Sequence, residues 1–194
     1  MLKEFEKRLL SSIILIPATF LIILEGEIFF YIFLSLAFLI SSYEWLKMIK
    51  RYDLKILGIL FLLFSFYSAF YFRSQNLEGF LLIILICIST DIGGYLFGKL
   101  FKGPKLTKIS PNKTYAGVFG GFLLAVVAGL VYDNFYYPVI PIYLETFINY
   151  SIEMKLLIFI LIISLISQIG DLIISYFKRL AKIKDTGKII PGHG

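Results

Sequence analysis

Long, nearly uncharged hydrophobic segments dominate the pattern along this chain. They are continuous, not alternating, and six of them are long enough to be helices: 9–24, 28–46, 54–72, 79–100, 116–132 and 155–177. A helix needs about 20 apolar residues to cross a bilayer, and backbone polar groups in lipid must be paired within the segment. Continuous segments also exclude the alternating strands of a membrane barrel. The pattern therefore predicts an all-α, polytopic bundle of about six transmembrane helices, forming one membrane-embedded domain over 1–194.

Composition agrees with a membrane protein. The chain has 194 residues, of which 59% are hydrophobic and 16% are charged, whereas soluble domains carry about 25% charged residues. No polar stretch is long enough to form a soluble module. The net charge is +6, which suits attraction to anionic lipid, and we expect no nucleic-acid partner.

Lysine and arginine gather in four polar segments, and two basic residues lie elsewhere. The segments are 3–8, 47–55, 99–113 and 178–188. If the six spans alternate, all four segments face the same side, and cytoplasmic loops are the ones that carry excess Lys and Arg. We therefore expect both termini and both large basic segments to be cytoplasmic. In a bacterium, the protein would lie in the inner (plasma) membrane with its site facing the cytoplasm.

Two carboxylates, Asp91 and Asp171, fall inside hydrophobic spans. Charges in hydrocarbon are costly, so such residues usually face a polar cavity or a partner. At ~1.5 Å per residue, Asp91 lies about 15 Å and Asp171 about 10 Å from the cytoplasmic ends of their helices. Mg²⁺ often binds one or two carboxylates together with substrate phosphates. Both are candidate metal ligands, and a proton or ion pathway is the alternative that chain position leaves open.

The last span carries a polar stripe. Its members are Ser164, Gln168, Asp171, Ser175 and Lys178. Their spacing of three and four residues places them on one helix face, running toward the cytoplasmic end. A row of interhelical hydrogen bonds is the structural alternative. The stripe favours a functional site, because it contains an ionisable residue and ends in a Lys-Arg pair.

The segment between the fourth and fifth spans reads GKLFKGPKLTKISPNKTYAG. Lysines, hydroxyl groups and loop N–H groups can hold phosphate, so Ser110, Asn112, Lys113 and Thr114 are candidate substrate-binding residues. The segment is not a P-loop, because it lacks GxxxxGK[ST]. A patch that binds lipid headgroups would have a similar pattern.

Small residues recur every four positions on the fifth span. They are Gly117, Gly121, Ala125 and Gly129. Such a face allows close helix contact, so we interpret these positions as packing.

The tail supplies the most specific motif in the chain. Its marked positions are Ser175, Lys178, Arg179, Lys184, Asp185, Gly187, Pro191, His193 and Gly194. This arrangement resembles the motif of the phosphatidate cytidylyltransferase (CDP-diacylglycerol synthase) family: Ser, two residues, Lys-Arg, four residues, Lys-Asp, a small residue, then Pro-x-His-Gly. The pair Gly170-Asp171 and the SPNKT block resemble the family's other marked segments.

The resemblance implies a reaction and a set of roles. CTP and phosphatidic acid, a membrane lipid, would give CDP-diacylglycerol and pyrophosphate, with Mg²⁺ as cofactor; a second cation and a homodimer are left open. The active-site segments would be 89–121 and 164–194. The implied catalytic residues are Asp171, Lys178, Arg179, Lys184, Asp185 and His193. Ser110, Asn112, Lys113, Thr114 and Ser175 would bind substrate, and Asp171 and Asp91 would bind the metal.

The chain departs from the family pattern in two places. Ala116 stands where the family usually has Glu, and the chain ends at Gly194, where the family continues into a further Gly, an acidic segment and another helix. One acidic metal ligand would then lie in that segment. We expect these 194 residues to insert into a membrane and to make little product without it.

Three other functions are compatible with parts of this pattern. A CTP-dependent kinase of a polyprenol-type alcohol would also need a basic loop and an intramembrane acid, but the Pro-x-His-Gly tail favours the cytidylyltransferase. A small ion-coupled transporter would place polar residues on both sides of the membrane midplane, whereas here they gather toward one end. An inactive remnant is the third.

Overall fold

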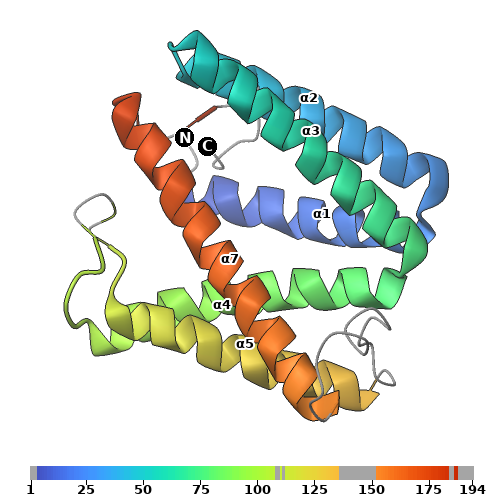
Figure 1. The fold of residues 1–194 in the computed structure, drawn as a ribbon, viewed down its shortest axis with the longest axis vertical. Coiled ribbons are helices and arrows are strands. Elements are labelled where there is room, and N and C mark those ends of the chain that lie inside the picture. Colours follow the sequence, from blue (N-terminus) through green and yellow to red (C-terminus); the bar gives the residue numbers. More distant parts are fainter. Residues whose placement is uncertain (1–3, 108–109, 111, 136–151, 184–185, 188–194) are drawn as a thin grey trace. The chain divides into compact units, whose positions relative to one another are not determined.

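The computed structural model describes residues 4–107, 110, 112–135, 152–183 and 186–187. Within these ranges the chain forms six helices (Figure 1): α1 Glu4–Glu25, α2 Glu27–Met48, α3 Tyr52–Gln75, α4 Leu77–Phe101, α5 Tyr115–Phe135 and α7 Ile152–Leu180. The described part has no strand, and a single antiparallel bridge pairs Lys105 with Thr114. The all-α prediction is confirmed, and each expected span lies within one of these helices.

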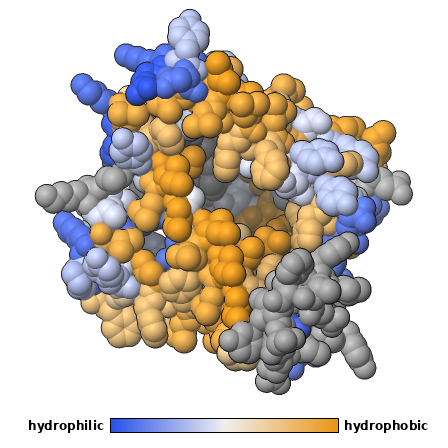
Figure 2. Space-filling view, viewed as in Figure 1, coloured by the Kyte–Doolittle hydropathy of each residue, from blue (hydrophilic) through white to orange (hydrophobic). Residues whose placement is uncertain are grey.

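Five of the described helices are long and apolar enough to cross a membrane, and the apolar part of α1, Ser11–Glu25, is shorter. Large apolar side chains along these helices remain exposed, and they cover much of the face seen in Figure 2. In water such a surface would be costly, at ~25 cal/mol per Å² of apolar area. The protein is therefore a membrane protein whose helices present apolar side chains to lipid.

The chain divides into two compact units, one of residues 1–75 and 177–194 and one of residues 76–176. In the first, Gly26 joins α1 to α2 with φ +68°, and a Cβ there would overlap the Arg73 guanidinium. Arg73 lies at the end of α3. It donates to the carbonyl of Ile23 at 2.7 Å and lies over the Phe30 ring. A cation beside unpaired carbonyls stabilises a helix C-terminus, so Arg73 fixes the turn between α1 and α2.

The same unit anchors the start of the tail on α2. The Trp45 and Phe177 rings meet edge to face at 5.0 Å, and Thr186 donates to a Glu44 carboxylate oxygen at 3.0 Å. A Cβ at Gly187 would overlap that carboxylate. The small residue of the tail motif leaves room for the Glu44 side chain, which the sequence patterns did not single out.

In the second unit, α4 and α5 pack through glycines. A Cβ on Gly117 would lie 2.7 Å from the carbonyl oxygen of Gly94, and one on Gly98 would lie 3.7 Å from the Gly117 Cα. Gly117, Gly121, Ala125 and Gly129 are all buried. Packing is therefore the role of the small residues on α5, as predicted. Helix α7 packs on α4 and α5 through a buried apolar cluster. Its members are Leu82, Ile86, Ala125, Leu156 and Ile160.

Replacing Gly93 with Ala is expected to lower the thermal stability of the protein in detergent. The new Cβ would overlap the backbone carbonyl of Gly120 on α5, and backbone cannot move aside as a side-chain tip can. Overpacking of this kind typically costs about 1–3 kcal/mol. Gly170→Ala is the control, because a Cβ there meets nothing within 4 Å. Melting temperatures that fall equally in both variants would contradict the interpretation.

Candidate functional site

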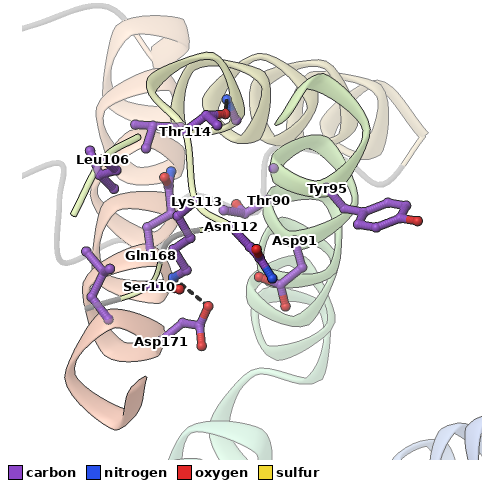
Figure 3. Close-up of a pocket in the computed structure, with 14 residues that line it drawn as sticks. Thr90, Asp91, Tyr95, Leu106, Ser110, Asn112, Lys113, Thr114, Gln168 and Asp171 are labelled. Carbon is purple, nitrogen blue, oxygen red and sulfur yellow. Dashed lines mark hydrogen bonds and ion pairs between the residues drawn. The ribbon is translucent and has the colours of Figure 1, made fainter. Parts of the chain in front are cut away.

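A cavity of about 430 Å³ opens in the second unit between α4, α7 and the loop before α5. Six predicted site residues line it: Asp91, Ser110, Asn112, Lys113, Thr114 and Asp171. Figure 3 shows Asp91 and Asp171 on different helices, with the loop side chains between them. Residues from three separate segments of the sequence thus meet in one place. The other described side chains of the lining include Thr90, Tyr95 and Gln168.

Backbone hydrogen bonds hold the loop before α5 in place. The N–H of Leu106 donates to the carbonyl of Lys113 at 2.8 Å, and the N–H of Lys113 donates to the carbonyl of Ser110 at 3.0 Å. Thr114 ends the loop: its hydroxyl oxygen accepts from the N–H of Gly117 at 3.1 Å, as N-cap side chains do. The predicted substrate-binding residue Thr114 therefore also starts α5 and anchors the neighbouring Lys113.

Lys113 reaches across the cavity to Asp171. Its Nζ lies 2.5 Å from the Asp171 carboxylate, and the two side chains are 24% and 59% exposed. Asp91 interacts electrostatically with both of them. Lys99, Lys102 and Lys105 of the same basic segment do not line the cavity. Lys113 of the predicted phosphate-binding loop therefore lines the cavity, whereas these three lysines are exposed outside it.

The residues present fit a hard divalent cation. Within the described ranges, no group of three or more His, Cys, Asp or Glu side chains could share a metal ion. Two carboxylates and the side chains of Asn112 and Gln168 line the cavity. This set suits Mg²⁺, because the ion commonly takes one or two carboxylates and completes its shell with phosphate and water. Asp91 and Asp171 would hold it, with substrate oxygens as the remaining ligands.

The polar stripe on α7 divides into two parts. Ser164 is fully buried and lies 2.8 Å from the Thr90 hydroxyl, so this end is the interhelical hydrogen bond that was the structural alternative. Gln168 and Asp171 line the cavity. Ser175 lies one turn further along α7 and outside the lining.

Asp171 is the one predicted catalytic residue among the described residues that line the cavity. Lys178 and Arg179 lie in the last turn of α7, in the first unit. Lys184, Asp185 and His193 lie outside the described residues. Thr90 was missed from the sequence, although it directly precedes Asp91; a hydroxyl beside an intramembrane acid was the available signal.

The chain resembles known proteins along most of its length. Residues 54–194 match the model of the cytidylyltransferase family. A phosphatidate cytidylyltransferase of Rickettsia conorii is 36% identical over 197 aligned residues, which cover 96% of this chain and 81% of that protein. One of Rickettsia bellii is 35% identical, with coverages of 96% and 80%. One of Staphylococcus epidermidis is 38% identical over 124 residues, or 63% and 43%.

No solved structure matches the chain. The matched range contains α4, α5 and α7 and every residue that lines the cavity. Because the family model matches residues 54–194 and relatives that are 35% and 36% identical align with 96% of the chain, this chain belongs to the cytidylyltransferase family.

Proposed function

We propose that this protein transfers CMP from CTP to phosphatidic acid, giving CDP-diacylglycerol and pyrophosphate. A phosphate oxygen of phosphatidic acid attacks the α-phosphorus of CTP, the bond from that phosphorus to the β-phosphate oxygen breaks, and pyrophosphate leaves. Family membership and relatives named phosphatidate cytidylyltransferase support this reaction. It belongs to membrane phospholipid biosynthesis.

The observation that carries the proposal is the cavity. It places Lys113 and the polar side chains of its loop opposite two carboxylates, between helices long enough to cross a membrane. A lipid phosphate and a water-borne nucleotide both need such a place, because the acyl chains stay in the bilayer while the triphosphate stays hydrated. An ion path through the membrane would not require a loop lysine that forms an ion pair with a carboxylate, as Lys113 does with Asp171.

The chain's own residues supply binding and orientation. Lys113 neutralises phosphate charge, and Ser110 and Asn112 offer hydrogen-bond donors on the same loop. Asp91 and Asp171 would bind Mg²⁺, which, when bound, stabilises charge on the transferring and leaving phosphates. The attacking phosphate is already ionised near neutral pH, so proton removal by a strong base is not required. Charge stabilisation and orientation are then the main contributions.

We place this site on the cytoplasmic side. The loop that carries Lys113 belongs to the basic segments, and positively charged loops stay cytoplasmic. CTP is then available without crossing the membrane. In a bacterium the membrane is the inner one.

Labelled CTP tests the reaction directly. Full-length protein in vesicles that contain phosphatidic acid is expected to move label from the α-phosphate of CTP into lipid, and label from the γ-phosphate into pyrophosphate. The α-label should stay out of lipid when phosphatidic acid is replaced by phosphatidylcholine. A kinase of membrane alcohols gives the opposite pattern, because it places the γ-label in lipid, and that pattern would refute the proposal.

A further inference from the structure

Beside the cavity, a buried hydroxyl pair joins two helices that each carry a site carboxylate. Thr90 on α4 is 1% exposed and Ser164 on α7 is 0% exposed, and their hydroxyl oxygens lie 2.8 Å apart. Thr90 directly precedes Asp91. Ser164 lies seven residues before Asp171 on α7, about two helical turns away on the same face.

One arrangement of the two hydroxyl protons satisfies both contacts of Thr90. The Thr90 hydroxyl also lies 2.8 Å from the carbonyl oxygen of Ile86, which can only accept. The single Thr90 proton is therefore directed to Ile86, and Ser164 donates to Thr90. The Ser164 oxygen is left to accept from Gln168, whose Nε2 lies 3.5 Å away. This order turns the Gln168 nitrogen toward Ser164 and its amide oxygen away from it.

Two side-chain hydrogen bonds between α7 and α4 are found among the described residues: the buried Thr90–Ser164 pair, and one between Cys87 and Ser167. The close backbone packing of this unit is between α4 and α5, and α7 packs less closely on them. The apolar contacts of Ile86 and Leu156 in the core cluster are not directional, whereas a hydrogen bond is. The space at the junction is also narrow, because a Cβ on Gly121 of α5 would lie 3.1 Å from the carbonyl oxygen of Thr90.

We propose that Thr90 and Ser164 are positioning residues for the transfer reaction. Their hydrogen bond sets the register of α7 against α4, and thereby the separation of Asp91 and Asp171, and it orients the Gln168 amide beside them. This inference rests on the proposed function for its catalytic meaning. Neither hydroxyl touches the reacting atoms: Thr90 acts through Asp91, and Ser164 acts through Asp171 and Gln168.

Four variants and one matched control separate positioning from stability. Thr90→Val keeps the volume and removes the hydroxyl, which leaves the buried Ser164 proton without its acceptor. Ser164→Ala removes the donor. In the double variant both hydroxyls of the pair are gone, so neither is left buried without the other, and the melting temperature should recover toward wild type. Thr90→Ser keeps the hydroxyl and should behave as wild type. Ser89→Ala removes a neighbouring hydroxyl that does not line the cavity and serves as the matched control.

Two readouts are measured on each full-length variant. Binding of Mn²⁺ in the presence of CTP, followed by electron paramagnetic resonance, should weaken roughly 10-fold in Thr90→Val and in the double variant, as when groups supporting a metal ligand are removed. The turnover number should fall roughly 10- to 100-fold, as for misplaced catalytic groups. KM for CTP should change little, because the Lys113 loop is anchored on α5.

The double variant tests whether the Thr90–Ser164 hydrogen bond positions the two carboxylates. If it binds Mn²⁺ and turns over as wild type does, the hydrogen bond does not position the carboxylates and the inference is wrong. Thr90→Ser as impaired as Thr90→Val would also overturn it. A full-length wild-type protein that binds Mn²⁺ and CTP but makes no CDP-diacylglycerol would refute the proposed function instead, while the Mn²⁺ comparison would still test the positioning role.

Discussion

Replacing Asp171 with Asn is expected to abolish synthesis of CDP-diacylglycerol while the protein still folds and inserts. The change keeps the size of the side chain and removes the charge that would hold a divalent cation. It also removes the partner of Lys113, to which Asp171 is joined at 2.5 Å. Removing a group that only supports a metal ligand lowers metal affinity or activity about 10- to 100-fold. Removing a ligand itself should therefore lower turnover more than roughly 100-fold.

The measurement is transfer of α-labelled CTP into lipid as the Mg²⁺ concentration is raised. Glu78→Gln is the control, because Glu78 is an exposed carboxylate in the first turn of α4, away from the cavity lining. That variant should keep the wild-type response to Mg²⁺. Turnover at the wild-type level in Asp171→Asn would show that Asp171 is not a metal ligand.

Replacing Lys113 with Met should have the second largest effect. It should weaken the interaction with CTP and strengthen the binding of Mn²⁺. Methionine keeps the length of the side chain and removes the charge. Hydrogen bonds to charged groups contribute about 1.5–3 kcal/mol, so KM for CTP should rise roughly 10- to 100-fold. Binding of Mn²⁺ without nucleotide should strengthen, because Asp171 no longer has a cation beside it.

Lys105→Met is the matched control for that change. Lys105 belongs to the same basic segment, but its side chain is exposed and does not line the cavity. Kinetics with CTP and Mn²⁺ titrations of the nucleotide-free protein give the two readouts. If both lysine variants raise KM for CTP equally, the segment acts as a diffuse charged surface and Lys113 is not a specific phosphate contact.

The sequence by itself determined the membrane-spanning helices and singled out two intramembrane carboxylates. Continuous apolar segments have one structural solution in lipid, since every backbone polar group must be paired within the helix. Intramembrane carboxylates such as Asp91 and Asp171 are rare for an energetic reason, so each stands out in the sequence alone. The repeated small residues of α5 are likewise recognisable as a packing face from their spacing.

The tertiary structure decided which of these residues act together. A polar stripe has the same spacing whether its members bond to a neighbouring helix or line a cavity, and here Ser164 does the first and Asp171 the second. The charge of Lys113 is no different from that of Lys105, yet Lys113 is the one paired with Asp171. Helical periodicity specifies the face of a residue and nothing about what packs against it. That information arises only when distant segments meet, because hydrogen bonds and ion pairs require contact distances that chain spacing does not contain.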